Sequence, residues 1–347
     1  MSKFVKTSLL VALIASLLLT GCTTTAPAAT ATEPATQAAT EIPATETMTA
    51  TEAATTAATE IASSEKMVIY APATASSIPV LIAAGKMDNV EVTLYTNQSQ
   101  ANTLFLRGDV NVLVSGLSVG VDLFKNEAPV QMVNSYVSGL SYLVTYGKHV
   151  NSFADMKGQE IYIPFEGSPI EEVTAFLAEK AGVTYKEDLS PVYAQFDSSV
   201  ELLKEGKAQA VILPEPNVSL VEGQPNIFIS ISLYDAWNQA TGSTDGYPQV
   251  GSFANAGWAA NHADQIAAFN KALGEAITEV QDDPATAVDS VSSQFKLPAA
   301  ILKKSLDRTR YHLLTGQEMA DAINNYYTVI GKPLDEKYSA FYYLAAQ

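Results

Sequence analysis

From residue 66 onward, two spacings of hydrophobic residues alternate along the chain. Short apolar runs bounded by polar residues predict strands, and apolar residues three or four positions apart predict amphipathic helices. The predicted strands are residues 67–70, 90–95, 110–114, 130–135 and 143–146, and the helices between them are 78–85, 101–107 and 119–125. This alternation is typical of α/β layering, in which helices cover a sheet.

A second, similar set of elements follows. The predicted strands are residues 160–163, 192–195, 210–213 and 228–232, and the helices are 153–158, 169–181 and 198–205. Pro169 opens one of these helices, with Glu171 and Glu172 in its first turn, where proline and acidic residues are favourable. We therefore expect a second α/β layer after the first.

The last hundred residues are mostly helical in pattern. The predicted helices are residues 262–280, 284–295, 298–310 and 317–330. The first of these places its apolar side chains on one face. We expect this tail to pack as a helical cap against one lobe.

A short internal repeat relates the two sets of elements. Residues 108–118 and 206–216 each show a glycine after a helix, a short apolar strand and a kinked loop. Glycine is the usual residue just beyond a helix end. The repeat predicts two related lobes, although a repeat this short also has chance as an alternative.

Charge excludes several classes of partner. Residues 66–347 hold 18 basic and 31 acidic residues, a net charge of −13. This balance argues against nucleic acid and against extended contact with anionic lipid. The chain has only three arginines, Arg107, Arg308 and Arg310. Few side chains are therefore available to clamp a strongly anionic ligand, although helix N-termini alone can hold an anion.

The amino terminus has the pattern of an export signal. Lys3 and Lys6 precede an apolar run at residues 9–19, which is too short to span a bilayer. The run ends in Leu19-Thr20-Gly21-Cys22, which resembles a bacterial lipobox. The resemblance implies a lipoprotein signal peptide at 1–21 and acyl chains such as palmitate on Cys22. The alternative is an ordinary secretory signal with a chance cysteine.

Cys22 is the only cysteine, so disulfides within the chain are excluded. Residues 23–65 are nearly all Thr, Ala, Pro and Glu, with six acidic residues and no Lys or Arg. Such a composition cannot bury enough apolar surface to offset its ordering entropy. We expect residues 22–65 to be the lipidated cysteine and a disordered tether.

Four motifs follow one another in a characteristic order. They are the strand-loop-helix pattern at 68–85, Leu-Arg-Gly-Asp-Val-Asn-Val at 106–112, Phe-Ala-Asp-Met-Lys-Gly-Gln at 153–159, and the run from 203 to Leu-Pro-Glu-Pro at 213–216. In this order the chain resembles the type II periplasmic solute-binding proteins of ABC importers. It resembles in particular the branch that serves nitrate, sulfonates, taurine and thiamine-precursor pyrimidines.

The resemblance implies an α/β, two-lobed periplasmic-binding-protein fold, with a mixed sheet flanked by helices in each lobe. Lobe one would comprise 66–145 and 250–347 with its C-terminal helical cap, and lobe two 146–249. A small-molecule ligand would bind in the cleft between the lobes. An ABC permease would be the partner of a monomer held by Cys22 on the extracytoplasmic face of the cell membrane.

Candidate ligand-binding residues lie in the strand-to-helix loops, where helix N-termini converge. They are Thr74, Ser76, Ser77, Asn97, Gly116, Ser118, Tyr136 and Gly139 in lobe one, and Glu166, Gly167, Ser168 and Glu215 in lobe two. Helix capping and turn formation are the alternative roles for the Ser and Gly residues.

Glu215 and Trp258 indicate a class of ligand. A carboxylate between two prolines is rigidly placed to accept hydrogen bonds from ring N–H or amino groups, with a solvated turn as the alternative. Trp258 could stack on a planar ligand, or could be a core residue. We expect a neutral planar heterocycle, such as a thiamine-precursor pyrimidine or a flavin. Nitrate, sulfonate or taurine stays open.

Enzymatic functions are less well supported. Gly116-Leu117-Ser118-Val119-Gly120 fits the nucleophile elbow of serine hydrolases, with His262 or His312 as the base. The motif falls early in the fold, however, and no oxyanion segment precedes it. Menaquinone-pathway dehydratases and fungal thiamine-pyrimidine synthases share the fold but are cytoplasmic. We expect no catalytic residue, no cofactor and, because the histidines are isolated in sequence, no metal site.

Overall fold

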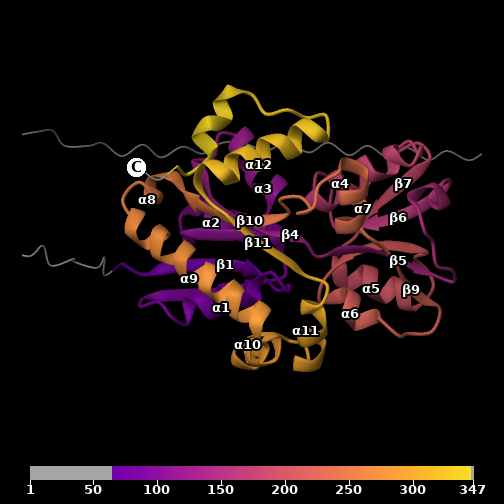
Figure 1. Ribbon diagram of the computed structural model, residues 1–347, viewed down its shortest axis with the longest axis horizontal. Helices are drawn as coiled ribbons and strands as arrows, with labels where there is room; N and C mark the ends of the chain where they lie inside the picture. Colours follow the sequence, from indigo (N-terminus) through magenta and orange to yellow (C-terminus); the bar gives the residue numbers. More distant parts are fainter. Residues whose placement is uncertain (1–64, 345–347) are drawn as a thin grey trace, which may run out of the picture. The chain divides into compact units, whose positions relative to one another are not determined.

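The computed structural model describes residues 65–344. The predicted signal peptide, Cys22 and tether lie outside the described residues. Within them, the strands form two separate mixed sheets, one of six strands and one of five. The helices cover both faces of each sheet (Figure 1).

The first sheet combines segments from both ends of the described chain. Its order is β11-β4-β10-β3-β1-β2. These strands are β1 (Met67–Pro72), β2 (Val90–Tyr95), β3 (Val112–Gly116), β4 (Val130–Gly139), β10 (Val250–Asn255) and β11 (Arg310–Leu314). β1 pairs in parallel with β2 and β3, whereas β10 is antiparallel to β3 and β4.

The second sheet is built from one continuous stretch of chain. Its order is β7-β6-β8-β5-β9. These strands are β5 (Ser141–Tyr146), β6 (Gln159–Ile163), β7 (Leu189–Tyr193), β8 (Ala210–Pro214) and β9 (Ile227–Ser232). β6 pairs in parallel with β7 and β8, whereas β5 is antiparallel to β8 and β9.

The two sheets share one topology. Reading outward from β2 or β7, each has three parallel strands, then an antiparallel strand that has just crossed from the other lobe, then a fifth strand, and the first sheet adds β11 at its edge. The two copies of the sequence repeat, 108–118 and 206–216, contain β3 and β8. These strands hold the same position in their sheets, so the prediction of two related lobes is confirmed.

Two chain segments cross between the lobes side by side. Leu140 separates β4 from β5, and residues 242–249 lead back to β10. Gln249, which is buried in the second segment, bonds twice to the first: its Oε1 accepts from Leu140 N–H at 3.2 Å and its Nε2 donates to Ser141 Oγ at 2.7 Å. Because β5 belongs to the second sheet, the sheets divide at Leu140, five residues before the boundary expected at 145.

The helices alternate with the strands. They are α1 (Ser77–Ala84), α2 (Gln98–Arg107), α3 (Leu117–Lys125), α4 (Pro169–Lys180), α5 (Phe196–Lys204), α6 (Asn217–Val221), α7 (Leu233–Thr241), α8 (Ala256–Ala259), α9 (Ala263–Asp282), α10 (Pro284–Val291), α11 (Ala299–Leu306) and α12 (Gly316–Val329). Short 3-10 turns are η1 (Phe153–Met156), η2 (Ser292–Gln294) and η3 (Glu336–Phe341).

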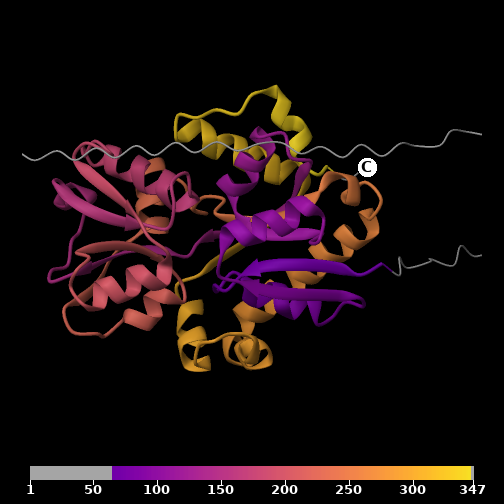
Figure 2. The same cartoon turned by 180° about the vertical axis from the view of Figure 1, so that it is seen from behind.

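The helical tail of the chain returns to the first lobe. α1, α9 and α10 pack on one face of the first sheet and α3 and α12 on the other (Figure 1). Seen from behind, the last helices lie on the same lobe as the first strands (Figure 2). The prediction of a helix at 298–310 was wrong at its end, because Arg310–Leu314 forms β11 on β4.

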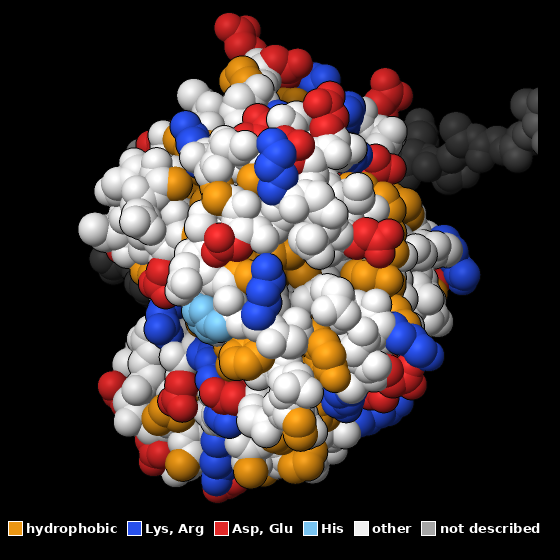
Figure 3. Space-filling model, turned by 90° about the vertical axis from the view of Figure 1, so that its right-hand side faces the viewer, with side chains coloured by type: hydrophobic (Ala, Val, Ile, Leu, Met, Phe, Trp, Pro, Cys, Tyr) orange, Lys and Arg blue, Asp and Glu red, His pale blue; other side chains and the backbone are white. Residues whose placement is uncertain are grey.

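Three apolar clusters hold these layers. One lies beneath α1 and α9, one beneath α5 and α6, and one joins α3 and α12 of the first lobe to α4 and α7 of the second. The second lobe, seen end-on, shows acidic and basic side chains mixed with hydrophobic ones (Figure 3). No helix among residues 65–344 is long and apolar enough to cross a bilayer.

Candidate functional site

A narrow cleft lies where the two sheets face each other. The carboxyl ends of β1 and β3 from the first lobe meet those of β6 and β8 from the second. The cleft contains two adjoining cavities of about 90 and 120 Å³. Both are lined by Pro72, Thr74, Tyr95, Gln98, Pro164, Phe165 and Phe196. Residues of both lobes therefore enclose one site.

The lining is aromatic and almost free of charge. Tyr95 comes from the first lobe, and Phe165 and Phe196 come from the second. Asp197 is the one charged side chain among the residues that line the two cavities, and none of them is Lys, Arg or His. Burial raises the pKa of Tyr95 and outweighs the opposing effect of the neighbouring Ser115 and Gln98 side chains, so its hydroxyl stays protonated.

Four helices begin at this cleft, and two of them, α2 and α4, have side-chain caps there. Asn97 Oδ1 accepts from Gln100 N–H at 2.9 Å at the start of α2, and Ser168 Oγ accepts from Glu171 N–H at 3.1 Å at the start of α4. α3 and α5 begin at Leu117 and Phe196. Helix N-termini carry partial positive charge, which favours oxygen atoms or electron-rich groups of a ligand.

Of the residues predicted from the sequence, Thr74, Gly116 and Ser168 line the cavities. Gly116 lies directly against the other lobe, since a Cβ at this position would be 2.5 Å from Pro169 Cγ. Close by, Ser118 Oγ donates to Gly167 O at 2.6 Å, which links the lobes through a side chain. These contacts hold the cleft narrow.

Ser76, Ser77 and Tyr136 lie behind the cleft instead of in it. Ser77 Oγ donates to Pro72 O at 2.5 Å, and Tyr136 Oη donates to Ser76 O at 3.0 Å. Ser76 Oγ shares a 2.7 Å hydrogen bond with Thr74 Oγ1. All three residues are buried, and they position the loop that carries Thr74.

Asn97, Gly139 and Glu166 line neither cavity. Asn97 is used as a helix cap, whereas its neighbours Thr96 and Gln98 reach the cleft. Gly139 is packed against Tyr234 at the end of β4. Glu166 is exposed and pairs with Lys186 at 2.7 Å. Their contact with a ligand therefore stays a prediction.

Trp258 is also outside the cleft, so the prediction of an aromatic wall there is wrong. β10 runs antiparallel to β3, so its first residue, Val250, reaches the cleft and its last, Asn255, lies at the opposite edge. Trp258 follows Asn255 on α8 and stacks on His262, with ring centroids 4.5 Å apart.

Glu215 is fully buried beneath the cleft. Its carboxylate accepts from Ser219 N–H and Ser219 Oγ, both at 3.0 Å, and from Arg308 Nη1 at 3.3 Å. Burial raises the pKa of Glu215 to about 7, against the hydrogen bonds from Ser219 and Arg308. The adjacent Pro214 lines a cavity, whereas Glu215 does not, so its direct contact with a ligand stays a prediction.

The aromatic lining was missed from the sequence. Tyr95 ends β2 and Phe165 lies in the loop before α4, both beside loops that were identified, whereas Phe196 opens α5 next to a loop that was not. Gln98 was also missed, although it is one residue from Asn97; its Oε1 accepts from Tyr95 Oη at 3.0 Å and from Ser115 Oγ at 2.9 Å. The sequence feature that could have identified these lining residues is an aromatic residue next to a strand-to-helix loop.

The residues of the hydrolase hypothesis are not assembled. Ser118 Oγ is bonded to Gly167 O. His262 bonds to Trp258 O and Glu65, and His312 lines a separate groove with Arg310 and Asp245. Among residues 65–344, no group of three or more His, Cys, Asp and Glu side chains could hold a metal ion.

Solved structures share this fold. The ligand-binding component of an ABC-type import system from Staphylococcus aureus, with zinc bound, superposes with a TM-score of 0.66 at 12% identity, covering 81% of this chain and 97% of that one. The periplasmic aliphatic sulphonate-binding protein SsuA from Escherichia coli gives a TM-score of 0.66 at 14% identity, covering 82% and 93%.

The periplasmic nitrate-binding protein NrtA from Synechocystis gives a TM-score of 0.60 at 14% identity, covering 73% of this chain and 74% of that one. These likenesses confirm the predicted two-lobed periplasmic-binding-protein fold. A comparison with curated protein sequences gave no match. The sequence model of the NMT1/THI5-like family matches residues 86–287, which is more than half of the chain. The chain belongs to the NMT1/THI5-like family.

Proposed function

We propose that this protein is the substrate-binding protein of an ABC importer and captures a small, neutral, planar heterocycle between its lobes. The fold, the family and the structural neighbours named as ABC-type binding components support the general role. Binding proteins of this kind work by closing around a ligand that contacts both lobes. The cleft described above has walls from both lobes.

The lining of the cleft carries the proposal for the ligand class. Three aromatic rings and one carboxylate face the cavities, and no cationic side chain is among the lining residues. Aromatic faces favour a planar ring, and Asp197 can accept hydrogen bonds from an amino group. A strongly anionic ligand would meet one negative charge and no formal positive charge.

The size of the cleft favours one ring over several. The cavities measure about 90 and 120 Å³, whereas sites for drug-sized molecules are roughly 300–1,000 Å³. An aminopyrimidine, such as a thiamine precursor, suits this space better than a flavin. Within the heterocycle class we therefore favour the single-ring ligand.

Nitrate, a sulfonate or taurine is the second candidate. The N-termini of α2, α3, α4 and α5 converge on the cleft, and backbone N–H groups can hold an anion without arginine. The structural neighbours include proteins named for sulphonate and nitrate binding. The two candidates differ in what the cleft would bind: an aromatic ring stacked on its aromatic side chains, or an oxyanion bound by backbone N–H groups.

We further propose that the protein acts as a monomer, anchored by acylated Cys22 on the extracytoplasmic face of the cell membrane, with an ABC permease as its partner. The lipobox-like Leu19-Thr20-Gly21-Cys22 supports the anchor. We propose no catalytic role, and the bond from Ser118 to Gly167 O, in place of a histidine, supports this.

Thermal unfolding of the chain against a ligand panel tests the function. The panel holds aminopyrimidines, flavins, alkanesulfonates, taurine, nitrate and amino acids. A ligand at 100 times its Kd stabilises by about 2.7 kcal/mol, a shift of a few degrees in Tm. We expect aminopyrimidines to shift Tm. If only a sulfonate or nitrate raised Tm, the ligand would be an anion and not a heterocycle. If no compound of the panel changed Tm, the proposed binding function would be contradicted.

A further inference from the structure

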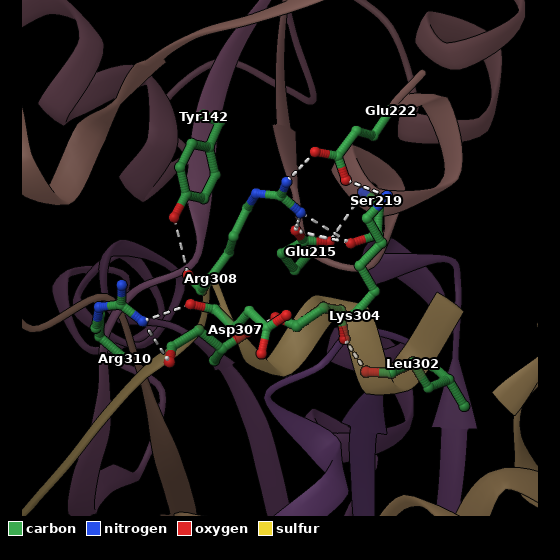
Figure 4. Close-up of polar contacts among 11 residues, drawn as sticks. Tyr142, Glu215, Ser219, Glu222, Leu302, Lys304, Asp307, Arg308 and Arg310 are labelled. Atoms are coloured by element: carbon green, nitrogen blue, oxygen red, sulfur yellow. Dashed lines mark hydrogen bonds and ion pairs between the residues drawn. The ribbon is translucent and has the colours of Figure 1, made fainter. Parts of the chain in front are cut away.

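Arg308 reaches from the first lobe into the second. It follows α11, which packs with α10 in the first lobe, and its side chain is 20% exposed. Nη1 lies 3.3 Å from Glu215 Oε1 and 3.3 Å from Ser219 Oγ, and Nη2 bonds to Glu222. Figure 4 shows the guanidinium group between the two carboxylates. One side chain thus bridges α11 and α6.

Arg308 lies in a cluster of two carboxyl groups and two basic side chains. Glu215 is fully buried, and Glu222 is partly buried and also pairs with Lys304 of α11. Burial opposes ionisation of Glu222, but the bonds from Lys304 and Arg308 outweigh it and hold its pKa below the usual value. Ion pairs in such shielded surroundings are screened less by salt than exposed pairs are.

This cluster is connected directly to both walls of the ligand cleft. The backbone O of Glu215 accepts from Ala75 N–H at 3.2 Å, and the backbone N–H of Glu215 donates to Leu140 O at 2.9 Å. Ala75 follows Thr74, and Glu215 follows Pro214, and both Thr74 and Pro214 line the cleft. Displacement of Glu215 would therefore move one wall relative to the other.

We propose that Arg308 is a positioning residue for ligand capture: it holds the Pro214-Glu215 turn of the second lobe against the loop at Thr74 of the first. The closed arrangement is then populated before ligand binds. The proposal rests on the proposed function only in taking this cleft as the ligand site. Pre-closure raises apparent affinity, because apparent Kd equals the intrinsic Kd divided by the closed fraction.

Interlobe distance in the absence of ligand tests this proposal independently of ligand identity. Spin labels would be attached through Ser99→Cys on α2 and Glu179→Cys on α4, both exposed, with Cys22→Ser to avoid a third label. We expect a single short-distance population in this background. Arg308→Ala should shift the distribution to longer distances and weaken ligand binding about tenfold if the closed fraction falls to roughly a tenth.

Lys303→Ala is the matched control, because Lys303 lies on α11, just before Arg308, but pairs with Asp289 within the first lobe. Arg308→Lys should give an intermediate distribution, because an ammonium group cannot bridge both carboxylates as a guanidinium does. If Arg308→Ala does not fold, the interlobe distance would be measured in Arg308→Lys and Glu222→Gln instead.

Unchanged distances in folded Arg308 variants would overturn the proposal, even if the protein binds an aminopyrimidine. A shift to longer distances would support it, even if every ligand of the panel failed to bind. The positioning role and the proposed function therefore fail separately.

Discussion

At Gly116 the backbone of the first lobe lies against Pro169 of the second without an intervening side chain. Gly116 has φ −66° and ψ 146°, which any residue can adopt. Glycine is required here only by the contact, since a Cβ would be 2.5 Å from Pro169 Cγ. A substitution at Gly116 should therefore affect the closure of the two lobes and not the folding of either lobe.

We predict that Gly116→Ala will weaken ligand binding and will also lower the stability of the ligand-free closed protein, because the added Cβ would clash with Pro169 in both states. Relief of the clash by partial opening should cost about 1–3 kcal/mol, or roughly a 5- to 150-fold rise in Kd. Titration calorimetry and thermal unfolding would measure the two effects. Gly85→Ala is the control, because its Cβ would meet only ordinary contacts at 3.5 Å. Equal affinity of both variants would contradict a closed ligand-bound state.

Glu215 should make stability depend on pH. Burial raises its pKa in the folded protein from 4.5 to about 7, so the folded state binds the proton more tightly than the unfolded state. Protonated Glu215 therefore contributes fully to the free energy of unfolding below about pH 4.5, and this contribution is lost as pH rises through 7.

The prediction is that wild type loses unfolding free energy relative to Glu215→Gln between about pH 4.5 and 7. Urea unfolding of both proteins at several pH values would measure this, and the difference between them removes the effects of other carboxyl groups. A difference that does not change with pH would show that Glu215 stays ionised across this range.

At the scale of elements, α4 carries a buried carboxylate that organises the loop before it. Glu171 Oε2 accepts from Gly167 N–H at 2.5 Å, and Oε1 accepts from Tyr193 Oη at 2.7 Å and Tyr185 Oη at 3.0 Å. This loop carries Phe165 and Ser168 into the cleft. The N-terminus of α4 and the wall of the site are therefore fixed together.

Glu171→Ala should reduce the free energy of unfolding by about 2–3 kcal/mol, because hydrogen bonds to a buried charged acceptor are lost. It should also weaken ligand binding by releasing the loop. Chemical denaturation and calorimetry would test both effects, with exposed Glu179→Ala on the same helix as the control. A stability equal to that of the control would show that the loop is held by other contacts.

The sequence predicted elements well where the signal was local. The helix predicted at 262–280 closely matches α9, and Pro169 does begin α4. β11 was missed because Arg310–Leu314 is stabilised by pairing with β4, about 170 residues earlier, and not by its own pattern. α6 and α8 were missed because each is short and its boundaries depend on tertiary packing.

At the scale of the whole molecule, the repeat at 108–118 and 206–216 was informative because it reflects a topology used twice. The site was predicted only in part. Three of the predicted residues in strand-to-helix loops line the cavities, but Trp258 was misplaced because β10, which precedes it, was not predicted and runs away from the cleft. The aromatic lining was missed because three rings from β2, α5 and the loop before α4 meet only after folding.

The most direct test of the ligand site is titration calorimetry of wild type and two cleft variants with a thiamine-precursor aminopyrimidine, ethanesulfonate and nitrate. Phe165→Ala and Phe196→Ala remove rings from the cleft, whereas Phe228→Ala removes a ring that is 37% exposed on β9. We predict that the aminopyrimidine binds wild type and Phe228→Ala alike, and binds each cleft variant at least about tenfold more weakly. Tight binding of an anion alone, or aminopyrimidine binding unaffected by loss of either cleft ring, would contradict the aromatic interlobe site.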